Sequence, residues 1–353
     1  MFSTQVESVI SGLRQQFQFR FNVRRSLGFL LVLGFFVSLA LHGCSGASNK
    51  TLQPLKVGIT TWPGFDIVLY AEEAGLFKQR GLNVELVRFE NQQDSSRAVM
   101  RGSLDAAFAS LWDVVQIDPG NDKPVVLLVT NISAGSDGIV AQAPIKSVKD
   151  LRGKRVGAKL GTVNHLILLE ALKLHGLKPE EVKIEDISNE SAVQLMEEKR
   201  LDAAVIWQPL LGETAQKIKG NIVFTTKEVD SLVIDTFLSR STLMASKKAE
   251  FTQFLGAWLD VMHAVETKPS EVFEKVGKRL NQEPAAFASD YAGLKKGDMA
   301  MQKRMFQSQS RLKEAMEQMG QLLQADPRAG RALRQDIEIN GEPISTAIEQ
   351  WKS

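Results

Sequence analysis

Apolar runs and amphipathic stretches alternate regularly along the chain from residue 55 onward. Short apolar runs predict strands, whereas apolar residues spaced three and four apart predict helices. In the first segment the pattern predicts strands at 55–60, 84–89, 105–110 and 125–131. It predicts helices within 66–80, ending near Gly81, and at 94–102, with Asp94 as the cap and Gly102 as the stop. This alternation is typical of an α/β fold.

A second segment repeats this order about one hundred residues later. Strands are predicted at 154–159, 182–187 and 202–207, and helices at 162–176 and 189–199. The sequence "KVGI" at 56–59 corresponds to "RVGA" at 155–158, and "LDAA" follows a helix in both segments. We therefore expect two α/β lobes, each with a mainly parallel sheet.

The remainder of the chain is predicted to be mostly helical. Helices are expected at 250–266 and 301–323, and a strand within 225–246 is expected to return to the first lobe. Trp258 and the methionines of the last helix fall on apolar stripes, so we expect them to pack in a core.

The first fifty residues have a different pattern. Arg24 and Arg25 precede an uncharged apolar run at 26–41, which is shorter than the roughly 20 residues of a membrane span. "HGC" and small polar residues follow it. We interpret residues 1–43 as a secretory signal peptide, Cys44 as a lipidated N-terminus and 44–53 as a flexible tether, with a plain signal or an uncleaved anchor as the alternative.

Composition narrows the function classes. The formal net charge of +2 over 353 residues gives no nucleic-acid signal. Removal of residues 1–43 takes away four arginines and one glutamate, which leaves a nearly neutral chain. Cys44 is the only cysteine, so disulfides, zinc–cysteine sites and thiol catalysis are excluded.

Candidate binding residues follow the carboxyl ends of the predicted strands, where open α/β sheets bind ligands. Three of the five tryptophans lie at these ends, together with small polar residues. The candidates are Trp62, Ser110, Trp112, Gly161, Thr162, Asn164 and Trp207. Flat aromatic faces beside hydrogen-bonding groups are typical of a small-molecule cleft. The start of the helix after Gly161 could stabilise an anionic group.

Each candidate also has a structural alternative. The three tryptophans could brace turns or fill a core, and Ser110 could cap a helix. Asp137 in "GSDG" is either a turn residue or the partner of a ligand amine. Asp235 lies in the apolar run "SLVIDTFL", where it either pairs structurally or faces the cleft. His175 is expected to interact with its own helix end.

Tests for enzyme motifs are negative. "GAKLGT" is neither G-x-G-x-x-G nor a P-loop, because the spacing differs and the lysine is missing. The sequence has no G-x-S-x-G elbow and no two histidines at metal spacing. We predict no catalytic residues, no metal and no cofactor.

At this point the sequence resembles a known family. "LKVGITTWPGFDIVLYAEEAGLFKQRGLNVELVRF", "RGSLDAAFAS", "DLRGKRVGAKLGTVNHLILLEALKLHGL" and "LDAAVIWQPL" are similar to solute-binding lipoproteins of ABC importers of the nitrate/sulfonate/taurine type. The resemblance covers about residues 54–270. Family members with "WEP" have a glutamate where this chain has Gln208, which argues against a strongly cationic solute.

The resemblance implies a type II periplasmic-binding fold with a ligand cleft between two lobes. The lobes would comprise 54–138 with 236–353, and 139–235. It implies ligand contacts by Trp62, Ser110, Trp112, Thr162, Asn164 and Trp207, with Asp137 and Asp235 as further polar contacts. The partners would be a small solute, a permease, an ATPase and the membrane through lipid on Cys44. We expect an extracytoplasmic, lipid-anchored monomer that binds no nucleic acid.

The leading hypothesis is an importer receptor for a small anionic or zwitterionic organic solute, such as a sulfonate or taurine. A thiamine-precursor pyrimidine or another heteroaromatic solute is the alternative. An iron-dependent pyrimidine synthase on the same fold would need a cysteine-rich motif, which this chain lacks. A sensory role of the same fold is the remaining hypothesis.

Overall fold

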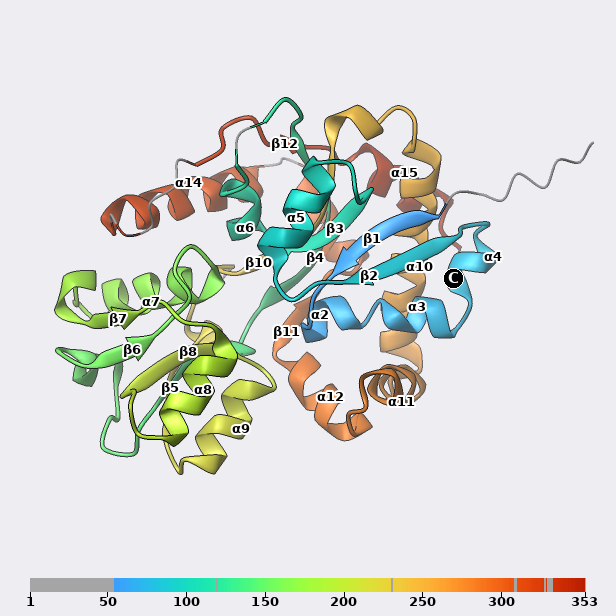
Figure 1. Ribbon diagram of the computed structural model, residues 1–353. Helices are drawn as coiled ribbons and strands as arrows, with labels where there is room; N and C mark the ends of the chain where they lie inside the picture. The colour runs from blue at the N-terminus through green and yellow to red at the C-terminus, as the bar shows by residue number, and fades with distance from the viewer. Residues whose placement is uncertain are drawn as a thin grey trace, which may run out of the picture. The chain divides into compact units, whose positions relative to one another are not determined.

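The computed structural model describes residues 54–352, except for residues 119, 230, 308–309, 327 and 329–332. Two sheets organise this part of the chain (Figure 1). The sheet that contains the first strand is called sheet A, and with its helices it forms lobe 1; sheet B and its helices form lobe 2. The predicted signal peptide, the tether and Cys44 lie outside the described residues.

Sheet A has seven strands in the order β11-β4-β10-β3-β1-β2, with β12 paired to β4. Its strands are β1 (Leu55–Ile59), β2 (Val84–Arg88), β3 (Ala106–Ser110), β4 (Pro124–Ser133), β10 (Ile234–Arg240), β11 (Leu294–Lys296) and β12 (Glu338–Ile339). β1 is parallel to β2 and β3, whereas β10 runs antiparallel to β3 and β4.

Sheet B has five strands in the order β7-β6-β8-β5-β9. They are β5 (Asp137–Ala141), β6 (Arg155–Gly157), β7 (Lys183–Glu185), β8 (Ala203–Trp207) and β9 (Asn221–Thr225). β6 is parallel to β7 and β8, whereas β5 is antiparallel to β8 and β9. Both sheets are therefore mixed: the parallel pairs join β1 to β2 and β3, β6 to β7 and β8, and β12 to β4, whereas the other pairs are antiparallel. The chain passes between the lobes from β4 to β5 and from β9 to β10. Each antiparallel pair includes at least one of these four strands, and antiparallel pairs need no crossover helix.

Helices flank both sheets. In lobe 2 they are α7 (Val163–Leu174), α8 (Asn189–Glu197) and α9 (Leu210–Lys217). In lobe 1 they are α2 (Pro63–Asp66), α3 (Leu69–Glu73), α4 (Leu76–Gln79), α5 (Gln92–Met100), α6 (Leu111–Val115), α10 (Lys248–Thr267), α11 (Pro269–Leu280), α12 (Pro284–Ala292), α13 (Met299–Phe306), α14 (Ser310–Ala325) and α15 (Glu342–Gln350). Short 3₁₀ turns lie at Val148–Leu151, Pro179–Glu181, Thr226–Glu228 and Ser241–Leu243.

Three helix predictions need correction. The helix expected within 66–80 is three short helices, and Gly75 between α3 and α4 adopts a left-handed φ of 69° that interrupts a continuous helix. The cap of α5 is Asn91, which accepts a hydrogen bond from the Asp94 backbone, so Asp94 lies in the first turn. The helix expected at 301–323 is split into α13 and α14.

The repeated "LDAA" sequence performs the same structural task in both lobes. Asp105 accepts a hydrogen bond from the backbone of Lys56 at 2.9 Å, and Asp202 accepts one from Arg155 at 2.8 Å. In both lobes a glycine, Gly58 or Gly157, lies two positions after the strand residue that donates this bond. A Cβ on either glycine would lie within 3 Å of the leucine of "LDAA". The sequence repeat therefore reflects a packing arrangement that occurs in both lobes, in which the glycine of the first strand lies close to the leucine of "LDAA" and to the preceding helix.

The chain passes between the sheets twice, at 134–136 and at 226–233. β5 begins at Asp137, so Asp137 belongs to sheet B, and β10 begins at Ile234, so Asp235 belongs to sheet A. The expected lobe limits placed Asp137 in lobe 1 and Asp235 in lobe 2. The structure shows the reverse. One apolar cluster contains buried residues of both lobes, including Val129, Ile139 and Leu166. Within the described residues, none of the helices combines the length and the apolar character needed to cross a membrane.

We predict that Gly58→Ala lowers the free energy of unfolding by about 1–3 kcal/mol, because overpacking forces neighbouring groups apart. The new methyl group would lie 2.7 Å from Leu104 Cδ1 and 3.1 Å from the Cβ atoms of Ala107 and Ser95. Gly120→Ala is the matched control, because no atom lies within 4 Å of a Cβ there. Urea unfolding measures both variants, and equal stabilities would contradict the packing argument.

Candidate functional site

Three strands of sheet A bring polar residues together at one end of lobe 1. β10 places Asp235 opposite Ser110 of β3 on one side and opposite Asn131 of β4 on the other. The indole Nε1 of Trp62 donates a hydrogen bond to Asn131 Oδ1 at 3.3 Å. Trp62 and Ser110, which were expected from the strand ends, therefore lie near Asp235, which was noted for its place in an apolar run.

Trp62 is held by its own turn. Its backbone N–H donates to Asp66 Oδ2 at 2.9 Å, and Arg88 Nη1 lies 2.7 Å from Asp66 Oδ1. Burial raises the pKa of Asp66 to about 6, while the Arg88 charge opposes that rise. A Cβ at Gly64 would collide with Asn131 and with Trp62 Nε1, so only glycine lets this turn approach β4. The "TWPGFD" sequence thus fixes the indole against the strand ends.

Ser110 performs the helix-capping role that was one of its two alternatives. Its Oγ accepts from the Asp113 backbone at 3.1 Å and donates to Asp113 Oδ2 at 2.6 Å. Trp112, in the first turn of α6, is fully buried in the apolar cluster shared by the two lobes. Its Nε1 is buried and makes no hydrogen bond within the described residues.

Lobe 2 contributes Asp137 and Trp207, which are opposite each other on β5 and β8. Asp137 is 2% exposed, whereas Trp207 is half-buried. Trp207 packs against an apolar cluster that is otherwise built mainly from lobe 1, including Phe65 and Phe108. The end of β8 therefore contacts lobe 1, as expected for a residue that lines an interlobe site.

The Gly161 turn also contacts lobe 1, but through its carbonyl oxygen. Gln93 and Gln116 of lobe 1 each donate a side-chain hydrogen bond to Gly161 O, at 3.1 and 3.0 Å. Thr162 caps α7 by accepting from the Asn164 backbone at 3.3 Å. The Asn164 side chain donates to Asn189 Oδ1 and to Val205 O, so its amino group is used within lobe 2.

The titratable groups at the junction of the lobes are carboxyls with raised pKa values. Burial raises the pKa of Asp137 to about 7, and a hydrogen bond with Ser133 opposes the rise. Burial also raises the pKa of Asp235 well above its usual value, and the negative charges of Asp137 and Asp113 add to this rise. Hydrogen bonds with Trp62 and Asn131 oppose it. Among the described residues, the groups that most affect these two carboxyls include no lysine or arginine.

Two carboxyl oxygens at this junction are buried without a hydrogen bond in the described part of the chain. They are Asp137 Oδ2 and Asp235 Oδ2. Buried polar atoms are nearly always paired, so such atoms mark a place where a polar group from outside the chain can bind. Carboxylates only accept hydrogen bonds, and protonated carboxyls both donate and accept. The arrangement can therefore bind a group that carries N–H donors.

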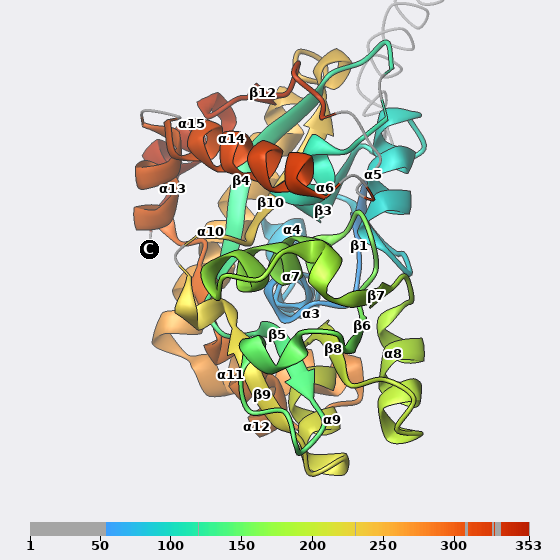
Figure 2. The same cartoon turned by 90° about the vertical axis from the view of Figure 1, so that its left-hand side faces the viewer.

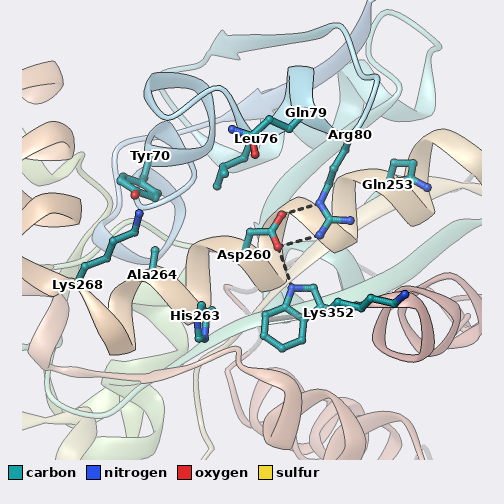
Figure 3. A pocket seen from close by; sticks show the side chains of 11 residues that line it. Tyr70, Leu76, Gln79, Arg80, Gln253, Asp260, His263, Ala264, Lys268 and Lys352 are labelled. Atoms are coloured by element: carbon teal, nitrogen blue, oxygen red, sulfur yellow. Dashed lines mark hydrogen bonds and ion pairs between the residues drawn. The ribbon is translucent and has the colours of Figure 1, made fainter.

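The described residues contain no group of three or more His, Cys, Asp or Glu side chains that could hold a metal ion. A cavity of about 670 Å³ lies on lobe 1, lined by α3, α4, α10 and Trp351 (Figure 3). Among its lining residues the single carboxylate, Asp260, is already bound by Arg80 at 2.6 and 2.8 Å and by Trp351 at 2.8 Å. The candidate site residues do not line this cavity, which lies where the C-terminus is fastened to α10.

Sequence reasoning missed several residues of this junction. Asn131 is a polar residue in the apolar run "VVLLVTNIS", which is the same signal that identified Asp235. Asp113 also follows a strand end, which is the signal that identified Ser110 and Trp112. Gln93 and Gln116 lie in or beside helices of lobe 1, and no sequence signal distinguishes them from ordinary surface glutamines.

Residues 62–272 match the NMT1/THI5-like family, and the chain belongs to it. A candidate binding protein of Brucella abortus (strain 2308) is 29% identical over 229 residues, covering 63% of this chain and 67% of that protein. The taurine-binding periplasmic protein of Escherichia coli (strain K12) is 25% identical over 154 residues, covering 43% and 47%.

Solved structures share the fold. The alkanesulfonate-binding protein SsuA from Xanthomonas axonopodis pv. citri, bound to MOPS, aligns with a TM-score of 0.67 at 15% identity, covering 82% of this chain and 99% of that chain. The desulfurization enzyme DSZB aligns with a TM-score of 0.60 at 15% identity, covering 84% and 99%. The predicted periplasmic-binding fold is confirmed. Because binding proteins and an enzyme share it, the fold alone does not decide between binding and catalysis.

We predict that the stability of the protein without solute falls as the pH rises from about 4 to about 7. The raised pKa of Asp137 means that the folded protein keeps a proton which the unfolded chain has lost above its usual value of 3.8. Stability is therefore full below the unfolded pKa and decreases by about 1.4 kcal/mol per pH unit for each such carboxyl.

Asp137→Asn should flatten this pH profile, as measured by urea unfolding at several pH values. Asp66, whose pKa is also raised, contributes equally to both proteins and cancels in the comparison. An unchanged slope in the variant would contradict the assignment of the proton to Asp137.

Proposed function

We propose that this chain is the solute-binding component of an ABC importer. Its family, its binding-protein relatives and the fold it shares with SsuA support this role. The contact between the lobes at Gly161 and Trp207 supports a site that opens by hinge motion to admit the solute. Binding rather than catalysis is supported by the binding-protein relatives and by the structural role of Ser110, whose hydroxyl caps α6 and is hydrogen-bonded to Asp113.

The observation that carries the proposal is the pair of buried carboxyl oxygens at Asp137 and Asp235. An ammonium group or the amino group of a heteroaromatic ring would supply the missing hydrogen-bond donors, and Trp62 and Trp207 would flank it. A cationic group would also lower the raised pKa values of the two carboxyls, so that they would bind it as carboxylates. We therefore propose a small solute with an N–H donor group, and not a simple anion.

A taurine-like zwitterion fits this site better than a sulfonate without an amine. Its ammonium would bind Asp137 and Asp235, and its anionic end would face Gly161 and Thr162 at the start of α7, where the helix dipole is favourable. An aminopyrimidine fits for the same reason at the carboxyls. Ser110, Trp112 and Asn164 would shape the site, chiefly by supporting its walls.

The same proposal includes the partners of an importer receptor. The loaded chain would dock on a membrane permease that works with an ATPase. Lipid on Cys44 would anchor it outside the cytoplasm, and it would act as a monomer. Each lobe would supply part of the docking surface, so that the permease could recognise the closed arrangement.

We predict that taurine or an aminopyrimidine raises the melting temperature of the purified protein, and that isethionate does so much less. Isethionate replaces the amine of taurine by a hydroxyl group and is otherwise closely matched. Calorimetry then measures the affinities of the compounds that bind. Tighter binding of isethionate than of taurine would contradict the role of the carboxyls, and no shift with any solute of a broad panel would overturn the binding function.

We also predict that Asp235→Asn weakens binding of the amine-bearing solute by about 10- to 100-fold, because a charge-assisted hydrogen bond contributes about 1.5–3 kcal/mol. The side chain keeps its shape, so loss of the negative charge is the main change. Glu349→Gln on the exposed side of α15 is the control and should leave affinity unchanged. Equal affinity of wild type and Asp235→Asn would remove Asp235 from the site.

A further inference from the structure

The C-terminal part of the chain, which lies beyond the family match at 62–272, is attached to lobe 1 at two places. Gln302 of α13 is buried, and its amide exchanges hydrogen bonds with the Val129 backbone at 2.6 and 3.1 Å. Farther along, the Arg334 backbone donates to Val115 O at 2.8 Å, and its guanidinium donates to Asp118 O at 2.9 Å. The ends of this segment are therefore part of lobe 1.

Between these two anchors, α14 lies against both lobes. It contacts α6 of lobe 1 and α7 of lobe 2, and both views show it lying beside these helices (Figures 1 and 2). Leu312, Met319 and Leu323 of α14 are buried in the apolar cluster that also contains α7 residues. The methionine stripe expected to pack in a core does so, and that core joins the lobes.

A buried hydrogen bond strengthens this contact immediately after α14. His165 Nε2 of α7 lies 3.0 Å from Asp326 Oδ2, and both side chains are almost completely buried. Arg328 donates hydrogen bonds from Nε and Nη2 to the same carboxylate at 2.8 Å, and from Nη2 to Pro179 O of lobe 2 at 3.3 Å. Asp326 is therefore fixed by groups from two parts of the chain. Hydrogen bonding to Arg328 and His165 outweighs burial and lowers the pKa of Asp326.

The other ring nitrogen of His165 acts on the candidate site. The backbone N–H of Gly161 points to His165 Nδ1 at 3.4 Å. Nδ1 therefore accepts and Nε2 carries the proton that is donated to Asp326. Gly161 has a left-handed φ of 73°, and its carbonyl oxygen receives the glutamines of lobe 1. One turn is thus held on its N–H side by His165 and on its C=O side by Gln93 and Gln116.

We propose that His165 is a positioning residue through which the C-terminal segment holds the Gly161 turn and stabilises the lobe arrangement seen here. α14 and Asp326 form a third connection between the lobes, in addition to the two chain crossings. Opening of the hinge must break the His165–Asp326 bond or carry α14 with lobe 2. His165 lies within the family match, but its partners α14 and Asp326 lie outside it, so the connection affects the opening equilibrium in a way that the matched region alone does not.

The test uses the purified protein without solute, so it does not depend on the proposed transport function. Asp326→Asn keeps the side-chain shape but weakens the bond to His165. Hydrogen exchange at the amides of Gly161 and the first turn of α7 should become about ten-fold faster. Small-angle X-ray scattering should show a larger radius of gyration. Glu317→Gln on the exposed side of α14 is the matched control and should change neither result.

The pattern of exchange separates positioning from a general loss of stability. A positioning role predicts that amides in β1–β3 exchange as in the wild type, and that His165→Gln combined with Asp326→Asn adds little to either single change. Uniformly faster exchange, or no change at Gly161 and in the radius of gyration, would overturn the proposal. If Asp326→Asn does not fold, Arg328→Gln, at a half-exposed arginine, gives the same comparison with a milder change.

Discussion

Two carboxyl groups, Asp137 and Asp235, are buried at the place where the chain passes between its two sheets. Burying a carboxyl is unfavourable unless it is protonated or paired, and both groups have raised pKa values for that reason. Their neighbours are arranged around this constraint: Asn131 and Trp62 on one side, Ser133 on the other. A structure that served stability alone would place apolar residues at these positions.

The two lobes reach this junction by the same local means. In each, a glycine in the first strand lets a helix pack closely, and the aspartate of "LDAA" ties the next strand to the first. Repetition of one packing unit produces two sheets with equivalent ends. The residues at those ends differ between the lobes: lobe 1 contributes Trp62 and Asp235, and lobe 2 contributes Trp207 and Asp137. A duplicated scaffold can thus carry two different walls of one site.

The tertiary contacts add a second role to the turn at the start of α7. Its strand–glycine–helix pattern is typical of anion sites, and the dipole of α7 remains available to a polar group. In the structure, however, the Gly161 turn also connects the two lobes. Gln116 of lobe 1 donates a hydrogen bond to the Gly161 carbonyl oxygen, and His165 accepts one from the Gly161 N–H. Both roles are compatible in the proposed binding protein, where solute binding would be coupled to the contacts between the lobes.

The sequence by itself determined β1–β4, β6–β8, the two-lobed fold, the internal repeat and the polar and aromatic residues at strand ends, because these depend on local periodicity and on caps such as Thr162. It also signalled Asp235 as an unusual residue in an apolar run. It did not predict β5, β9, β11 and β12. Only the tertiary structure decided that β10 lies antiparallel between β3 and β4, that Asn131 joins Trp62 and that α14 bridges the lobes. Strand register and contacts between distant segments depend on packing energies that no local pattern contains.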